Sequence, residues 1–124
     1  MNICLDTETT GLNPSFDEIL QLSIIDSNTN EVLFNDYFKP QYTVCWDEAQ
    51  AVNGISYDDV SNCKSITQSL AQIQNIIDRA DKIYGYNVNF DIAFLEQAGI
   101  EVRAELVDVM TEFAEQYGEW NSAF

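Results

Sequence analysis

Residues 5–12 read Leu-Asp-Thr-Glu-Thr-Thr-Gly-Leu and follow a short apolar run at the start of the chain. If residues 2–6 form a strand, Asp6 and Glu8 point to the same side of it, because side chains two positions apart in a strand share a face. Two carboxylates held that close repel each other unless a divalent cation lies between them. We therefore expect a metal site, and its all-oxygen ligands favour magnesium or manganese.

The composition indicates a single globular domain over residues 1–124, since 46% of the residues are hydrophobic and 12% are aromatic. No apolar run approaches the roughly 18 residues that a membrane span requires, and no basic leader precedes one. We expect a cytoplasmic protein with no membrane attachment. The three cysteines are widely spaced and the chain has no histidine, so neither a zinc site nor a disulfide framework is expected.

The charge of the chain is strongly negative: 21 acidic residues against five Lys and Arg give −16. Binding along a nucleic-acid duplex takes several clustered cations, and here the cations are scattered. A few nucleotides could still be held through a bound metal ion, which supplies positive charge. An acidic surface could also reflect the proteome of the host or suit a partner with a basic face, and composition does not choose among these.

Periodicity predicts an α/β fold with a mixed five-stranded sheet flanked by helices. The first three strands, at 2–6, 19–26 and from 32 to about 39, are joined by short turns and form an antiparallel meander. The elements expected after them are a short helix at 47–52, a helix at 66–79 capped by Ser65, a strand at 82–86, a helix at 89–98 stopped by Gly99, a strand at 102–109 and a last helical stripe from Met110 to Tyr117.

A third acid, Asp91, lies in the first turn of the predicted helix 89–98, directly after a strand. That position puts it at the edge of the sheet where strand residues 2–6 also end. The helix dipole favours an acid in a first turn, and Asp6 and Glu8 could be two solvated acids, so a structural explanation stays open for each.

Two other motifs share part of the pattern in residues 6–17. A calcium-binding loop has similar spacing but follows a helix, whereas the residues before Asp6 are strand-like. A haloacid-dehalogenase-type site would need aspartate in place of Glu8 and a late acidic pair, whereas Asp58-Asp59 is expected in an early loop. We exclude both.

Asp6-Thr7-Glu8-Thr9-Thr10-Gly11-Leu12 resembles the first motif of the DnaQ-like (DEDD) 3′-5′ exonucleases of the proofreading-subunit type. Asn87-x-x-Phe90-Asp91, followed by Ile-Ala-Phe-Leu, resembles their second motif. Between them, Ala51-Val52-Asn53-Gly54-Ile55 stands where many members carry His-Gly-Ile. The resemblance extends from residue 2 to about residue 120 and implies a ribonuclease-H-like fold.

The resemblance implies that Asp6, Glu8 and Asp91 are catalytic and bind two Mg²⁺ or Mn²⁺ ions. Water would hydrolyse the terminal phosphodiester at the 3′ end of a single-stranded nucleic acid and release a nucleoside monophosphate. The resemblance also implies substrate contacts. Thr9 and Gly11 would contact the terminal nucleotide through backbone groups, and Leu12 would wedge against its base. Asn87 would help to position the nucleic-acid strand.

The family's third motif, His-x-x-x-x-Asp or Tyr-x-x-x-Asp on a late helix, has no match: Tyr117 is followed four residues later by Asn121. Asp108 is expected to be a structural acid. We therefore expect a domain that is C-terminally incomplete, with its final helix missing. Without a general base the chain alone should be weakly active or inactive, because such a base contributes about 10²–10⁴ in rate.

A missing final helix would leave one face of the sheet uncovered. That face could serve self-association or a protein partner. The alternative function is therefore a non-catalytic, degenerate exonuclease fold that acts as a protein-binding module.

Overall fold

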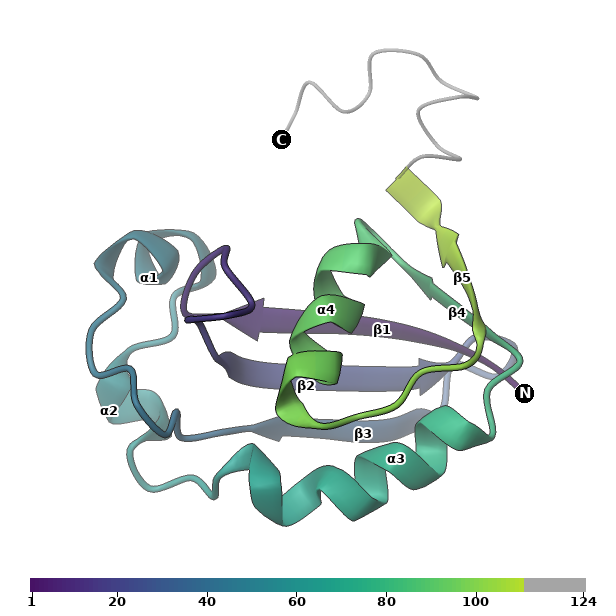
Figure 1. Ribbon diagram of the computed structural model, residues 1–124, viewed down its shortest axis with the longest axis horizontal. Coiled ribbons are helices and arrows are strands. Elements are labelled where there is room, and N and C mark those ends of the chain that lie inside the picture. Colours follow the sequence, from purple (N-terminus) through teal and green to yellow (C-terminus); the bar gives the residue numbers. More distant parts are fainter. Residues whose placement is uncertain (111–124) are drawn as a thin grey trace.

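The computed structural model describes residues 1–110, in which five strands form one mixed sheet (Figure 1). The strands are β1 (Asn2–Thr9), β2 (Ile19–Asp26), β3 (Val32–Tyr37), β4 (Lys82–Gly85) and β5 (Glu105–Asp108). Their spatial order is β3-β2-β1-β4-β5, with β1, β2 and β3 antiparallel and with β4 parallel to both β1 and β5. The expected mixed sheet, with three antiparallel strands first, is confirmed.

The helical elements are α1 (Asp47–Asn53), α2 (Tyr57–Val60), the 3-10 helix η1 (Ile66–Ser69), α3 (Leu70–Asp78) and α4 (Val88–Ala98). Ser65 caps η1 as predicted, since its hydroxyl accepts a hydrogen bond from the backbone of Thr67. Gly99 ends α4 in the left-handed region, with φ of 110°.

Helix α2 was not predicted, and Asp58-Asp59 therefore lies in a helix rather than in a loop. The signal was present: Ser56 and Asp59 form a capping box, in which each side chain accepts a hydrogen bond from the other residue's backbone. The helix has only four residues, too few for a periodic pattern.

Strand β1 runs three residues further than predicted, and Asp6 and Glu8 therefore lie within it. Its antiparallel pairing with β2 continues to Thr9 opposite Ile19, with a register shift between Glu8 and Thr9. The β-branched side chains of Thr7 and Thr9 favour an extended backbone, and pairing with β2 carries the strand to Thr9.

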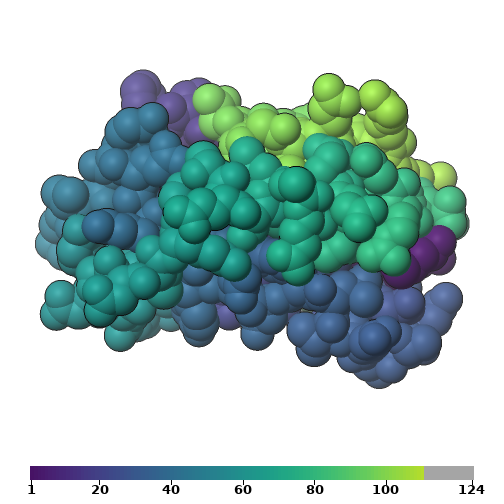
Figure 2. All heavy atoms as spheres, turned by 90° about the horizontal axis from the view of Figure 1, so that it is seen from below, coloured from purple at the N-terminus to yellow at the C-terminus, as the bar shows by residue number. Residues whose placement is uncertain are grey.

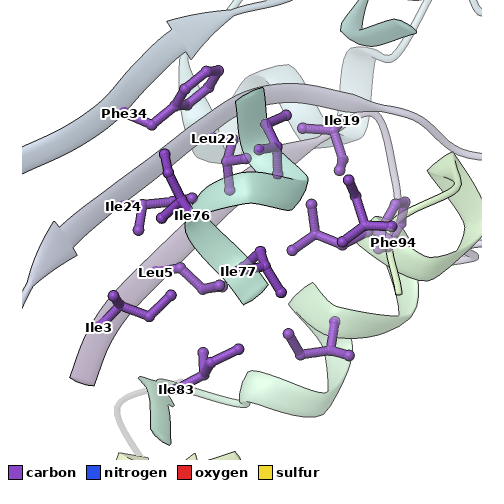
Figure 3. Packing of buried hydrophobic residues seen from close by; sticks show 14 of the residues in the cluster. Ile3, Leu5, Ile19, Leu22, Ile24, Phe34, Ile76, Ile77, Ile83 and Phe94 are labelled. Atoms are coloured by element: carbon purple, nitrogen blue, oxygen red, sulfur yellow. The ribbon is translucent and has the colours of Figure 1, made fainter. Parts of the chain in front are cut away.

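Both long helices pack on the same face of the sheet, with α4 in front of β1 and β2 (Figure 1). Side chains of β1, β2 and β4 meet Ile76 and Ile77 of α3 and Phe94 of α4 in one cluster (Figure 3). In the view from below, the segment that contains α3 covers the middle of that side of the molecule (Figure 2). A second cluster, Leu20 with Trp46, Ile55 and Val60, fastens α1 and α2 beside the sheet.

Alternate residues of β1 point away from this core: Cys4 and Glu8 are half-buried and Asp6 is exposed. Neither α3 nor α4 covers that opposite face. All but the first residue of the helical stripe expected from Met110 to Tyr117 lie outside the described residues. Within residues 1–110 no helix is long and apolar enough to cross a membrane.

Glu18, at the start of β2, holds the segment after β3 in place. Its carboxylate accepts hydrogen bonds from the backbone nitrogens of Gln41 (2.6 Å), Tyr42 (3.0 Å) and Thr43 (2.8 Å), and from the Thr43 hydroxyl (2.8 Å). Partial burial raises the pKa of Glu18, but the four hydrogen bonds together outweigh it, so the pKa lies below its ordinary value.

We predict that Glu18→Gln lowers the free energy of unfolding by about 1–3 kcal/mol at pH 7, because charge-assisted hydrogen bonds are lost. The folded-state pKa is depressed, so this contribution is present above the unfolded-state pKa of about 4.3 and disappears as the pH falls through the folded-state pKa. Urea unfolding at pH 7 and pH 3 measures the difference. Glu31→Gln, an exposed control with the same charge change, should have little effect, and an equal loss at both pH values for Glu18→Gln would contradict the prediction.

Candidate active site

The end of β1 places acids on one face of the sheet and a threonine on the other. Asp6 and Glu8 alternate with Thr7, which points toward α4 and is only 8% exposed. The sequence predicted that Asp6 and Glu8 would share a face, and the alternating burial of β1 is consistent with it.

Asp91 reaches the site from α4, which begins directly after the turn that follows β4. In this turn Asn87 adopts the left-handed conformation, with φ of 52° and ψ of 49°, which asparagine accepts more readily than most residues. Its backbone nitrogen donates a hydrogen bond to Oδ1 of Asp108 (3.1 Å), which also accepts one from the nitrogen of Met110 (3.0 Å). Asp108 thus has the structural role that the sequence predicted.

The close approach of the turn to β1 depends on Gly85. A Cβ atom there would lie 3.1 Å from the carbonyl oxygen of Leu5 and 3.2 Å from a methyl carbon of Val88. Because a side chain would push these groups apart, glycine lets the first turn of α4 lie against β1.

The carboxylate of Asp91 is buried, with 3% of the residue exposed. Its Oδ1 accepts a hydrogen bond of 2.5 Å from the hydroxyl of Thr7, whereas its buried Oδ2 has no hydrogen-bond partner. Buried carboxylate oxygens are normally paired, so an unpartnered one indicates a place for a further ligand.

The pKa of Asp91 is raised to about 7, with burial as the largest cause; the hydrogen bond from Thr7 lowers it, and the negative charges of Asp6 and Glu8 add to the rise. Desolvation also raises the pKa of Glu8, with a smaller contribution from the charge of Asp6. For Asp6, desolvation raises the pKa and a hydrogen bond from the Thr7 backbone lowers it. The three acids thus lie within electrostatic range of one another, as perturbed acids in active sites do.

The three carboxylates do not form a finished metal site. Among residues 1–110, no group of three or more Asp, Glu and Cys side chains is arranged so that it could hold an ion as it stands. The metal-ligand set of Asp6, Glu8 and Asp91 therefore stays a prediction, supported by their raised pKa values and by the free Oδ2 of Asp91.

A cleft of about 860 Å³ opens beside the end of β1. Its walls come from the end of β1 and the loop after it, from α1 with Trp46, and from Phe90 in the first turn of α4. Four residues predicted from the first motif line it, namely Glu8, Thr9, Gly11 and Leu12. Leu12 is 84% exposed and projects into solvent, as a side chain that contacts a ligand would.

Asn87, also predicted to contact substrate, does not line this cleft. In the structure Asn87 forms the turn before α4. Its contact with substrate stays a prediction. Gly11 is not among the glycines with a left-handed backbone. Instead, the carboxylate of Asp17 occupies the space that a side chain at residue 11 would need, 2.4 Å from the position of a Cβ atom.

Sequence reasoning did not assign a role to Asn53, although it stands in the segment Ala51–Ile55 that was compared with the family. Its side chain donates a hydrogen bond to the carbonyl of Thr9 (3.1 Å) and accepts one from the backbone of Ile55 (3.0 Å). The indole of Trp46 donates to the carbonyl of Ile55 (2.7 Å). These bonds fasten the α1 wall of the cleft to the end of β1.

Phe90 and Val52 were also missed as cleft residues. Phe90 was visible within the second motif, and Val52 within the segment at 51–55, where its 89% exposure sets it apart from a core residue. Only the fold brings them opposite the loop after β1.

A family model described as Exonuclease (RNase_T) matches residues 3–116, most of the chain. The chain belongs to the exonuclease family. The predicted relationship to DnaQ-like 3′-5′ exonucleases is confirmed by this match and by the curated relatives.

The relatives of this exonuclease-family chain include a DNA polymerase III subunit epsilon from Buchnera aphidicola subsp. Schizaphis graminum, 29% identical over 115 residues. The match covers 86% of this chain and 48% of that protein. A PolC-type DNA polymerase III from Ureaplasma parvum is 30% identical over 98 residues, which are 77% of this chain and 7% of the relative. The chain thus spans less than half the length of these relatives.

Solved structures show the same fold. A product-bound exonuclease I superimposes with a TM-score of 0.77 at 20% identity, over 98% of this chain and 33% of the other. Exonuclease X in complex with 5′ overhanging duplex DNA gives a TM-score of 0.73 at 18% identity, over 96% of this chain and 66% of the other. The expected ribonuclease-H-like fold is confirmed.

We predict that Asp91→Asn stabilises the fold by about 1–2 kcal/mol at pH 8 and has little effect at pH 4. The folded-state pKa lies above the unfolded value of about 3.9, so stability is greatest below that pH and is lost as the pH rises from there to the folded-state pKa of about 7. Asparagine avoids the buried charge and still offers Thr7 an acceptor. Urea unfolding at the two pH values measures this.

Asp58→Asn serves as the control, since Asp58 is exposed on α2 and the charge change is the same. Its stability should change by less than about 0.5 kcal/mol. A destabilised Asp91→Asn protein at pH 8 would refute the idea that this acid is held in the fold at a cost to stability.

Proposed function

We propose that this chain is a two-metal 3′-5′ exonuclease domain that removes nucleoside monophosphates from the 3′ ends of single-stranded nucleic acid. The observation that carries the proposal is the buried Asp91, with one unpartnered oxygen, within electrostatic range of Asp6 and Glu8. Of these three acids, Glu8 lines the open cleft. Membership of the exonuclease family supports the reaction class.

Asp6, Glu8 and Asp91 would hold two Mg²⁺ or Mn²⁺ ions. The donors are all carboxylate oxygens, which suit hard divalent cations, and none of the ion pairs among residues 1–110 includes one of these three acids. Such ions supply positive charge to the attacking and leaving oxygens of phosphodiester hydrolysis when they are bound. The carboxylates of Asp6, Glu8 and Asp91 would contribute the negative charge that attracts the two ions and holds them in place.

The cleft would receive the terminal nucleotide. Thr9 and Gly11 would contact it through backbone groups, Leu12 would pack against its base and Asn87 would help to position the strand. Leu12, Val52 and Phe90 give the cleft apolar surface, which suits contact with bases of any sequence. Low sequence specificity follows from this.

The cleft offers no cationic side chain to a phosphate in the part of the chain that the structure describes. Tight binding of a long strand is therefore not expected, since affinity for nucleic acid comes mainly from neutralised phosphates. We expect weak activity from the 124 residues alone, because they contain no histidine to act as general base.

The test is a nuclease assay with Mn²⁺ on a single-stranded oligonucleotide labelled at its 5′ end. We predict slow shortening from the 3′ end in the wild type and a loss of at least about 100-fold in Asp6→Asn and Glu8→Gln, because each removes a charge from the ion site. Asp58→Asn controls for charge. Equal shortening by wild type and both variants would mean that a contaminating nuclease, not this site, acts.

The substitution Leu12→Ala separates binding from chemistry. If Leu12 contacts the terminal base, its truncation raises KM several-fold and leaves kcat nearly unchanged, since a wedge of this kind acts on binding. Phe16→Ala is a matched control, because Phe16 is also exposed (78%) in the same loop but does not line the cleft. A purely catalytic loss in Leu12→Ala would contradict its proposed role.

The alternative is a non-catalytic module that binds a basic protein. It is favoured by the net charge of −16 and by the absence of Lys and Arg from the described cleft lining. The face of the sheet opposite α3 and α4 could serve such a partner or a second copy of the chain. A chain that binds no Mn²⁺ at millimolar concentration would favour this alternative. The cytoplasmic location stays a prediction.

A further inference from the structure

We propose that Thr7, the residue between the two acids of β1, is a positioning residue that orients Asp91 for ion binding. The inference rests on the proposed function, in which Asp91 is a metal ligand, and adds a residue to which the motifs assign no task. Thr7 and Asp91 are 84 positions apart in the chain, and the fold joins them by a side-chain hydrogen bond.

The two carboxylate oxygens of Asp91 have different surroundings. Oδ1 accepts the hydrogen bond from Thr7, 2.5 Å long, and Oδ2 has no partner although it is buried. With Oδ1 fixed, rotation of the carboxylate about its terminal bond is restricted, and the same oxygen always faces away from Thr7. The free oxygen is then the one available to a cation.

Thr7 is itself held firmly. Only 8% of it is exposed, and it lies in the central strand, paired with Leu22 of β2. Threonine is branched at Cβ and has few side-chain conformations in such a setting, so its hydroxyl has a defined place. Gly85 keeps the first turn of α4 close enough for the bond to form.

Thr7 stands between Asp6 and Glu8 in β1, and its hydroxyl donates a hydrogen bond to Asp91 of α4. The acid that comes from α4 is therefore tied to the strand that carries the two other acids. Hydrogen bonds to metal-ligating carboxylates orient them, and their loss typically lowers metal affinity by about 10–100-fold.

The experiment measures Mn²⁺ binding by calorimetry in the 124-residue chain, together with urea unfolding at the same pH. Thr7→Val keeps the shape and removes the donor, and we expect it to weaken Mn²⁺ binding at least tenfold. Thr7→Ser keeps the donor and should bind Mn²⁺ within about threefold of the wild type, even if loss of the buried methyl lowers its stability.

Thr43→Val is the matched control. Thr43 also donates its hydroxyl to a carboxylate, that of Glu18 at 2.8 Å, away from the cleft and the acids. Its loss should reduce stability and leave Mn²⁺ binding unchanged. The control therefore separates a general loss of stability from a specific loss of ion binding.

Two results would overturn the inference while the proposed function stands: wild-type affinity in folded Thr7→Val, or equally weak binding in Thr7→Ser and Thr7→Val. The second would mean that packing of the methyl group, not the hydrogen bond, matters. If the wild type itself takes up no Mn²⁺ at millimolar concentration, the proposed metal site fails and the role of Thr7 fails with it.

Discussion

A carboxylate buried against the hydrophobic side of a sheet is the constraint on which this site depends. Asp91 is almost fully inaccessible, and only one of its oxygens has a hydrogen-bond partner. Burial and two neighbouring acids disfavour its charged form, so the folded chain holds it at some cost to stability. Acids kept in such surroundings are typical of functional sites, where stability is given up for reactivity.

Strand β1 lies in the middle of the sheet and presents side chains to both faces. Its neighbours β2 and β4 hold it on both edges, so alternate side chains have fixed directions. Ile3 and Leu5 pack into the core beneath α3 and α4, and Thr7 continues this row up to Asp91. Asp6 and Glu8 stand on the other side. The site therefore lies where the core ends, which gives it a rigid support and access to solvent at once.

The cleft shows how distant segments are combined into one surface. The loop after β1 forms one wall, and α1 forms another through the hydrogen bond from Asn53 to the carbonyl of Thr9. Phe90 adds a ring from α4. Apolar and acidic groups make up most of this lining, and no Lys or Arg is among the cleft residues in the described part of the chain.

The sequence alone determined the type and order of the main elements and the mixed sheet, and it singled out the candidate acids, because periodicity, caps and two motifs are local signals. It placed Asp91 in the first turn of α4 and gave Asp108 a structural role, and both hold in the structure. It ended β1 too early and missed α2, since pairing with β2 and a four-residue helix leave little local pattern.

Only the tertiary structure decided which partners these residues have. The contact between Thr7 and Asp91, the support of Thr9 by Asn53 and the place of Phe90 in the cleft all join segments far apart in the chain. No local pattern encodes them, because each depends on the packing of α4 and α1 against the end of the sheet. The burial that raises the pKa of Asp91 is likewise a property of the packed core, and a sequence shows only that the acid is there.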